Sequence, residues 1–79
     1  MAKVKVFSTP SCSYCITLKE FLKGHNIEFD DIDVSQDEMV LVEMVKKSGQ
    51  MGVPVIDIDG EIIIGFDKKK VVKLLNIKE

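Results

Sequence analysis

The sequence contains no long run of apolar residues and no basic stretch interleaved with aromatic residues. A helix that crosses a membrane needs about 18 or more consecutive apolar residues, and every apolar run here is much shorter. The 11 basic and 13 acidic residues are mixed along most of the chain and leave a net charge of −2. This composition gives little support to a membrane protein or to a nucleic-acid-binding protein.

Linkers, internal repeats and low-complexity tracts are also lacking. With 79 residues, of which 46% are hydrophobic and 30% charged, the chain is near the lower size limit for a globular domain that folds unaided. We expect residues 1–79 to form a single domain. Residues 1–7 alternate charged and apolar side chains, unlike the apolar segment of a signal peptide. We therefore expect a cytoplasmic protein, in a compartment where thiols stay reduced.

The hydrophobic pattern changes repeatedly between the period of a strand and that of a helix. Strand-like segments occur at residues 3–7, 27–34, 55–58 and 61–64. The second of these slips in phase between Phe29 and Ile32, which indicates a bulge or an early strand end. Asp59-Gly60 separates the last two segments, and this pair between apolar runs is the strongest short-range signal for a β-hairpin.

Three helices are predicted between and after these strands, the first directly after the cysteines. Ser35 and Glu38 have the spacing of a capping box, and Asp67 is a candidate N-cap. Gly24 and Gly49 suit the left-handed position at a helix end. The faces expected to be buried are Cys15, Leu18 and Leu22, then Leu41, Met44, Val45 and Ser48, then Val71, Leu74 and Leu75. The order β-α-β-α-β-β-α predicts an α/β fold with a four-stranded mixed sheet, a parallel first β-α-β unit and helices on both faces.

Both cysteines lie in the segment S-T-P-S-C-S-Y-C, residues 8–15. Cys12 stands at the predicted helix start, where unpaired N–H groups and the helix dipole favour thiolate. We expect Cys12 to be ionised near neutral pH and to attack a disulfide. Cys15, one turn later on the buried stripe, can reach Cys12 and resolve the mixed disulfide. Tyr14 is either an aromatic contact for the substrate or simply a surface residue.

Other interpretations of the cysteine pair remain open. Small apolar thiols can fill a core, although Cys12 stands among serines and a proline. A closed zinc site needs four ligands, and His25 lies at the far end of the predicted helix. A zinc or iron–sulfur site would therefore need two chains or an added thiol, which makes a metal-binding dimer the main alternative. A docking domain without catalysis, using Val53–Ile56 and Phe66, is a third possibility.

The sequence resembles the glutaredoxin family of the thioredoxin superfamily over nearly its whole length. The matching segments are Val4–Phe7, Cys12-Ser13-Tyr14-Cys15, Lys47-Ser48-Gly49, Gly52–Asp57 and Gly65-Phe66-Asp67. The resemblance implies a thioredoxin-like fold, with Cys12 as nucleophile and Cys15 as resolving thiol. It also implies a cis bond between Val53 and Pro54, facing the cysteines and presenting the Val53 backbone to the substrate. The expected substrate contacts are Tyr14, Val53, Pro54, Gly65, Phe66 and Asp67.

Several residues depart from the glutaredoxin pattern. Ser13 replaces a common proline, and Thr9 stands in the region where a lysine is expected. A Gly-Gly pair is reduced to Ile64-Gly65, followed by Phe66. The lysine and glycines of the family hold glutathione, whereas the Gly-Phe variant is also similar to ribonucleotide-reductase redoxins that thioredoxin reductase reduces. We expect a monomeric oxidoreductase for protein or glutathione mixed disulfides, without bound metal or cofactor. Its reductant is either glutathione or a thioredoxin reductase, with Thr9 and Phe66 favouring the latter.

Overall fold

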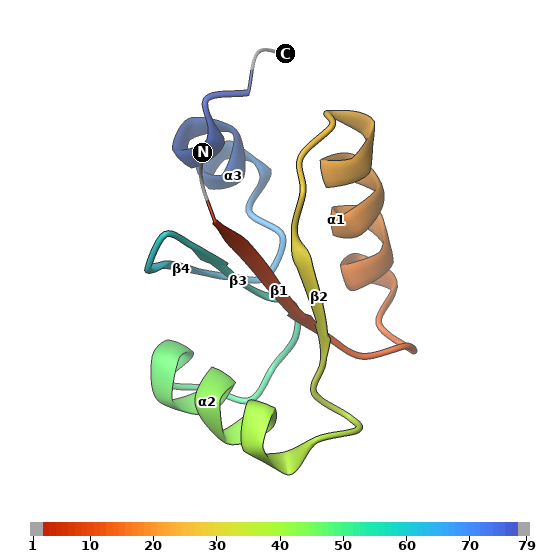
Figure 1. Ribbon diagram of the computed structural model, residues 1–79, viewed down its shortest axis with the longest axis vertical. Coiled ribbons are helices and arrows are strands. Elements are labelled where there is room, and N and C mark those ends of the chain that lie inside the picture. Colours follow the sequence, from red (N-terminus) through yellow and green to blue (C-terminus); the bar gives the residue numbers. More distant parts are fainter. Residues whose placement is uncertain (1–2, 78–79) are drawn as a thin grey trace.

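The computed structural model describes residues 3–77, whose strands form one four-stranded sheet with helices on both faces (Figure 1). The elements are β1 Val4–Ser8, α1 Ser13–Gly24, β2 Asp30–Asp33, α2 Glu38–Ser48, β3 Val55–Ile58, β4 Glu61–Ile64 and α3 Lys68–Leu75. The strand order is β2-β1-β3-β4, with β1 parallel to β2 and antiparallel to β3, and β3 antiparallel to β4. The predicted element order and mixed sheet are confirmed.

Helices α1 and α3 cover one face of the sheet, and α2 covers the other (Figure 1). Successive side chains of a strand point to opposite faces. Val6 of β1 therefore packs with Leu18 of α1 and Val71 of α3, whereas Phe7 packs with Met44 of α2. Because β1 is an inner strand held from both faces, the loop that leaves its carboxyl end starts from a fixed point.

Several predicted turns are confirmed. Gly49 follows α2 with a φ of 76°, and Asp67 caps α3 by accepting a hydrogen bond from the Lys70 N–H at 3.3 Å. Asp59 and Gly60 join β3 to β4 with φ values of 51° and 92°. Two successive residues of positive φ are what a type I′ hairpin turn needs.

The predicted capping box at the start of α2 is wrong. Asp37 is the N-cap, and its carboxylate accepts a hydrogen bond from the Met39 N–H at 2.9 Å. Ser35 is held instead by Asp33, whose Oδ1 accepts bonds from the Ser35 N–H at 2.9 Å and its hydroxyl at 2.6 Å. Local side-chain bonds of this kind compete with capping, so the aspartate before the helix displaces the serine.

The end of α1 and the start of β2 also differ from expectation. Gly24 is the last residue of α1, and the left-handed residue is Asn26, with a φ of 58°. Strand β2 begins at Asp30, where the chain comes into register with β1. Ile27 and Phe29 precede the strand but still pack against the core. Because both side chains are apolar, the sequence pattern predicted a strand that begins at residue 27 instead of at Asp30.

Helix α3 has a narrower buried face than predicted. Val71 is fully buried and Leu75 packs against the core one turn later, whereas Leu74 is 39% exposed. Residues four apart share a helix face, and Leu74 lies beside that row. Among the helices formed by residues 3–77, none combines the length and the apolar character needed to cross a bilayer.

Candidate functional site

The cysteine segment leaves the carboxyl end of β1 and enters α1. Cys12 is the N-cap of α1, with extended backbone angles of −89° and 110°, and its N–H donates to the Thr9 carbonyl at 3.3 Å. The Cys12 Sγ accepts a hydrogen bond from the Cys15 N–H at 3.1 Å. A sulfur thus occupies the place that a serine or aspartate oxygen takes in an ordinary N-cap. The N–H groups of a helix start stabilise negative charge at this position.

Cys15 lies within the first turn of α1 and is fully buried. Burial raises the pKa of the Cys15 thiol to about 12, and a hydrogen bond with the Cys12 side chain adds to the increase. The Thr9 backbone and the positive charge of Lys19 act in the opposite direction. Both cysteines are free thiols, Cys12 partly accessible and Cys15 enclosed. The two sulfurs therefore have opposite environments.

Val53 and Pro54 lie beside Cys12. The peptide bond between them is cis, and the Cys12 thiol donates to the Val53 carbonyl with a sulfur–oxygen distance of 3.9 Å. Pro54 is buried, and its carbonyl accepts a hydrogen bond from the Gly65 N–H at 2.8 Å. The fold therefore brings together Cys12, Val53, Pro54 and Gly65 from three separate parts of the chain.

The loop before Val53 is held by side chains that the sequence analysis did not assign to the site. The Gly52 N–H donates to the Gln50 Oε1 at 2.6 Å, and the Gln50 Nε2 donates back to the Gly52 carbonyl at 2.9 Å. The Ser48 hydroxyl donates to the Met44 carbonyl at 2.7 Å and lies 2.9 Å from the Gln50 carbonyl. These bonds connect the loop to the end of α2. They position Val53 opposite Cys12.

The other predicted substrate contacts have varied surroundings. Tyr14, next to Cys15 in the first turn of α1, is 71% exposed. Phe66 packs on Phe21 of α1, with ring centroids 5.6 Å apart, and joins the core on that face. Asp67 caps α3. Phe66 and Asp67 thus stabilise the junction between α1 and α3, and Tyr14 is accessible to a partner.

Lys19 is a charged neighbour of the cysteine segment that the sequence analysis missed. Its Nζ lies 3.1 Å from both carboxylate oxygens of Asp31 on β2 and 3.2 Å from the Ser8 hydroxyl at the end of β1. Lys19 follows Cys15 by four residues, a spacing that places side chains on the same helix face. That spacing was readable in advance, but the pairing with β1 and β2 was not.

Within residues 3–77, no group of three or more His, Cys, Asp or Glu side chains is placed to hold a metal ion. His25, which follows the last residue of α1, packs against Phe21 in a tilted arrangement with ring centroids 4.6 Å apart. A metal or iron–sulfur cluster at the cysteine pair would need ligands beyond those of this segment, as the dimer hypothesis requires.

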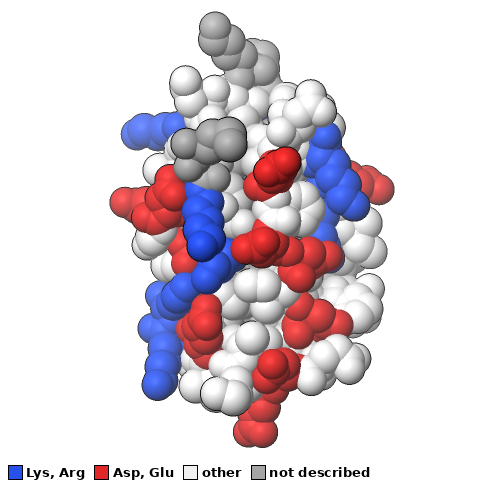
Figure 2. Space-filling view, in the orientation of Figure 1, with Lys and Arg blue, Asp and Glu red and all other residues white. Residues whose placement is uncertain are grey.

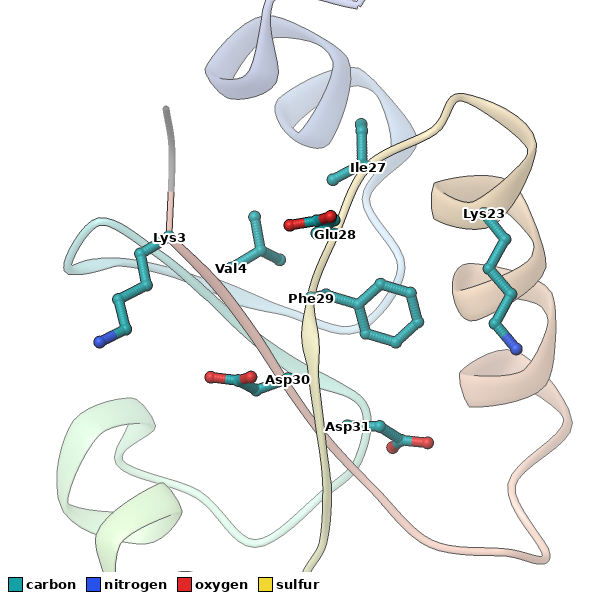
Figure 3. Close-up of a pocket in the computed structure, with 8 residues that line it drawn as sticks. All are labelled: Lys3, Val4, Lys23, Ile27, Glu28, Phe29, Asp30 and Asp31. Carbon is teal, nitrogen blue, oxygen red and sulfur yellow. The ribbon is translucent and has the colours of Figure 1, made fainter.

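A separate groove of about 700 Å³ lies where β1 begins (Figure 3). It is lined by Lys3, Val4, Lys23, Ile27, Glu28, Phe29, Asp30 and Asp31. Because Cys12 follows the other end of β1, this groove is distinct from the cysteine site. Lysines and carboxylates line it together, and the face in Figure 2 shows the same mixture of charges. Both surfaces therefore carry charges of both signs.

Comparison with known proteins agrees with this arrangement. The glutaredoxin family profile matches residues 4–63. A glutaredoxin-like 8.6 kDa protein in the rubredoxin operon of Clostridium pasteurianum is 49% identical over 72 residues, or 91% of this chain and 96% of that protein. Glutaredoxin 3 of Escherichia coli is 33% identical over 67 residues, or 85% and 81% of the two chains. The glutaredoxin-like protein NrdH of Lactococcus lactis is 34% identical over 71 residues, or 90% and 97%.

The fold comparison gives the same result. A crystal structure of a mutant of the thioredoxin-like protein BC3987 superimposes with a TM-score of 0.91 at 35% identity, over 99% of this chain and 100% of that one. Glutaredoxins are thiol–disulfide oxidoreductases of the thioredoxin fold. Because the family profile covers most of the sequence and the relatives span nearly all of it, the chain belongs to the glutaredoxin family.

Proposed function

We propose that this protein is a dithiol–disulfide oxidoreductase in which Cys12 attacks a substrate disulfide and Cys15 resolves the mixed disulfide. The observation that carries the proposal is the N-cap position of Cys12, whose sulfur receives the Cys15 N–H at 3.1 Å beside the Val53 carbonyl. Burial makes Cys15 a poor first nucleophile, since it raises the pKa of that thiol to about 12. These environments support different roles for the two thiols.

The reaction proceeds in two exchanges. The Cys12 thiolate attacks one sulfur of the substrate disulfide, the substrate S–S bond breaks, and the first product leaves as a thiolate that takes a proton from solvent. Cys15 then loses its proton to solvent and attacks the Cys12 sulfur. The bond between Cys12 and the substrate breaks, and the second product leaves. Two electrons have passed to the substrate, and the protein holds a Cys12–Cys15 disulfide.

We further propose that an extended substrate segment lies along the loop beside Cys12. A backbone in the position of Val53 can pair with an incoming chain as a neighbouring strand does. The exposed Tyr14 offers an aromatic surface, and Gly65 allows close approach because it has no side chain. Phe66 and Asp67 support this edge through packing and capping. The proposed contact surface is Tyr14, Val53 and Gly65, whereas the side chain of Pro54 is buried and does not reach the surface.

As reductant we propose a flavoprotein of the thioredoxin-reductase type. Thr9 cannot supply the charge-assisted hydrogen bond that a lysine gives to a glutathione carboxylate, a contact of about 1.5–3 kcal/mol. The Gly-Gly pair of the family is reduced to Ile64-Gly65, and the Phe66 that follows is similar to the Gly-Phe variant of the redoxins. Both a glutaredoxin 3 and an NrdH are relatives at similar identity, so identity alone favours neither donor. We place the reaction in the cytoplasm, carried out by a monomer without a bound cofactor.

Trapping of the mixed disulfide tests the function. With insulin as the disulfide substrate, a Cys15→Ser variant should accumulate a covalent adduct that dithiothreitol reverses, because no thiol remains to release it. The wild-type protein should instead end as an internal disulfide, lighter by two hydrogen atoms in intact-mass spectrometry. A Cys12→Ser variant is the matched control and should form no adduct. Adducts at Cys15 in that control, at a rate equal to those at Cys12, contradict the assignment of roles.

A further inference from the structure

Lys19 has an unusual position for a helix lysine. Its side chain is only 19% exposed, and its Nζ lies 3.1 Å from both oxygens of Asp31 and 3.2 Å from the Ser8 Oγ. Ser8 itself is 2% exposed, and its hydroxyl donates to Asp31 at 3.1 Å. The three side chains form a closed triangle. The ammonium is therefore held over the carboxyl end of β1, where the cysteine loop begins.

This position brings a positive charge to the buried side of the cysteine pair. Lys19 and Cys15 are one helical turn apart on α1, so their side chains leave the helix on the same face. Burial is the main cause that raises the pKa of Cys15, whereas the Lys19 charge makes a smaller contribution that lowers it. The ammonium of a lysine that extends into solvent is hydrogen-bonded by water and does not contact a buried hydroxyl. The Ser8 contact keeps the ammonium turned inward.

We propose that Lys19 is a positioning residue for the second exchange, in which its ammonium, anchored by Ser8 and Asp31, stabilises the Cys15 thiolate as it attacks Cys12. The inference rests on the proposed roles of the two cysteines. In this step Cys15 loses its proton to solvent, the Cys12–Cys15 bond forms, and the bond between Cys12 and the substrate breaks. The departing substrate thiolate takes a proton from solvent. Lys19 keeps its own proton throughout.

The triangle is open to solvent on one side. A small groove of about 290 Å³ opens beside it. The charged groups that face this region are Lys19 from α1 and Asp31 and Asp33 from β2. Asp31 is 51% exposed, so its negative charge is screened by water more than the inward-turned ammonium is. The groove is lined by Ser8, Pro10, Lys19, Asp31 and Asp33.

Stopped-flow reaction with excess dithiodipyridine separates the two exchanges. This uncharged disulfide releases one coloured thione when Cys12 attacks and a second when Cys15 resolves the adduct. At mildly acidic pH little Cys15 is ionised, so the second phase is slow enough to follow. In a Lys19→Met variant we expect the second phase to slow by about threefold to tenfold, the effect of one nearby charge, with the first phase unchanged. Lys19→Arg should restore most of the second rate.

Lys23→Met is the matched control, since it removes a lysine from the same helix outside the triangle, and both of its phases should equal those of the wild type. An unchanged second phase in Lys19→Met overturns the inference while leaving the roles of the cysteines intact. Equal slowing of both phases, or failure of Lys19→Arg to recover, assigns Lys19 a purely structural role. Release of a single thione by the wild-type protein overturns the two-thiol reaction, and the inference with it.

Discussion

Cys12 and Cys15 are chemically the same side chain, and α1 alone makes them different. The first stands before the helix, where its sulfur accepts the N–H of the second. The second stands inside the first turn, enclosed by the core. A thiol that meets both the N–H groups of a helix start and an accessible surface is placed to react first. The division of labour proposed for the pair therefore follows from a shift of three positions along one helix.

Alkylation of Cys12 tests this environment directly. In a Cys15→Ser variant, iodoacetamide at neutral pH should modify Cys12 about tenfold faster than it modifies a free cysteine, because the helix start stabilises the thiolate. The control is a peptide of residues 8–15 with the same Cys15→Ser change, which is too short to form a stable helix. Equal rates in protein and peptide would show that the fold does not activate this sulfur.

At the level of single residues, the candidate site could be predicted only in part from the sequence. The spacing of Cys12 and Cys15 and the helical pattern after them were enough to predict one partly accessible and one buried thiol. Lys19 was not identified, because its partners Ser8 and Asp31 lie on two strands, and no local pattern links them to the helix. Side-chain contacts between elements far apart in sequence depend on the assembled fold.

Helix α2 is attached to the sheet by an ion pair as well as by its apolar face. The Lys47 Nζ lies 2.8 Å from the Asp57 Oδ2 on β3 and 3.3 Å from the Glu43 Oε2. Asp57 is 7% exposed and also accepts the Gly60 N–H at 2.8 Å. Burial acts to raise the pKa of Asp57, but the Lys47 ammonium and the Gly60 N–H outweigh it and hold the pKa below its ordinary value.

The lowered pKa of Asp57 gives stability a pH dependence of known sign. The stabilisation is present above the ordinary carboxyl pKa of about 3.9 and is lost as pH falls through the lower folded value, because the unfolded chain then binds the proton more readily. Lys47→Met should reduce the free energy of unfolding by about 2–3 kcal/mol at neutral pH, since it leaves Asp57 buried without its cation. Urea denaturation should show this difference shrinking below about pH 4.

Lys46→Met is the control for that experiment, because Lys46 is exposed on the same helix. Its free energy of unfolding should follow that of the wild-type protein across the pH range. A constant difference between Lys47→Met and wild type at all pH values would mean that lost packing of the lysine stem, and not its charge, is responsible.

The helices and strands were more predictable from the sequence than the residues at which they begin and end. Periodicity was sufficient for all seven helices and strands and for their order, because it reflects which face each element buries. The first residue of a helix depends on which of several nearby polar side chains accepts a hydrogen bond from a free N–H group. Ser35 matched the capping pattern, yet Asp37 caps α2 while Asp33 holds the serine. Phe66 could equally have been a contact for a partner, and only its distance to Phe21 shows that it packs within the molecule.

At the scale of the whole molecule, the sheet divides the interior into two cores and places the reactive segment at one end. The groove in Figure 3 and the cysteine pair lie at opposite ends of β1. Charge of either sign is spread over the visible surface (Figure 2). On this face, therefore, no single sign of charge dominates.

The choice of reductant is a property of this end as a whole. We expect NADPH oxidation to be rapid when a thioredoxin reductase is coupled to this protein and a disulfide substrate, and near the blank when glutathione and glutathione reductase replace it with hydroxyethyl disulfide. The reason is that Thr9 stands where glutaredoxins have a lysine and that the Gly-Gly pair is reduced to Ile64-Gly65. A Thr9→Lys variant should raise the glutathione-dependent rate, and Thr9→Val serves as its uncharged control. Rapid turnover of the unmodified protein with glutathione would reverse the proposed donor.

Cys15, Leu18 and Leu22 form one buried row along α1. The proposed reaction begins at the Cys12 sulfur, which is partly accessible to water, and ends with attack by the Cys15 sulfur, which belongs to this row. A new covalent bond there ties the hydrophobic interior to the rim, so the two redox forms differ in how tightly the start of the helix is anchored. On the proposed reaction, oxidation would therefore attach the start of α1 to the buried row by a covalent bond.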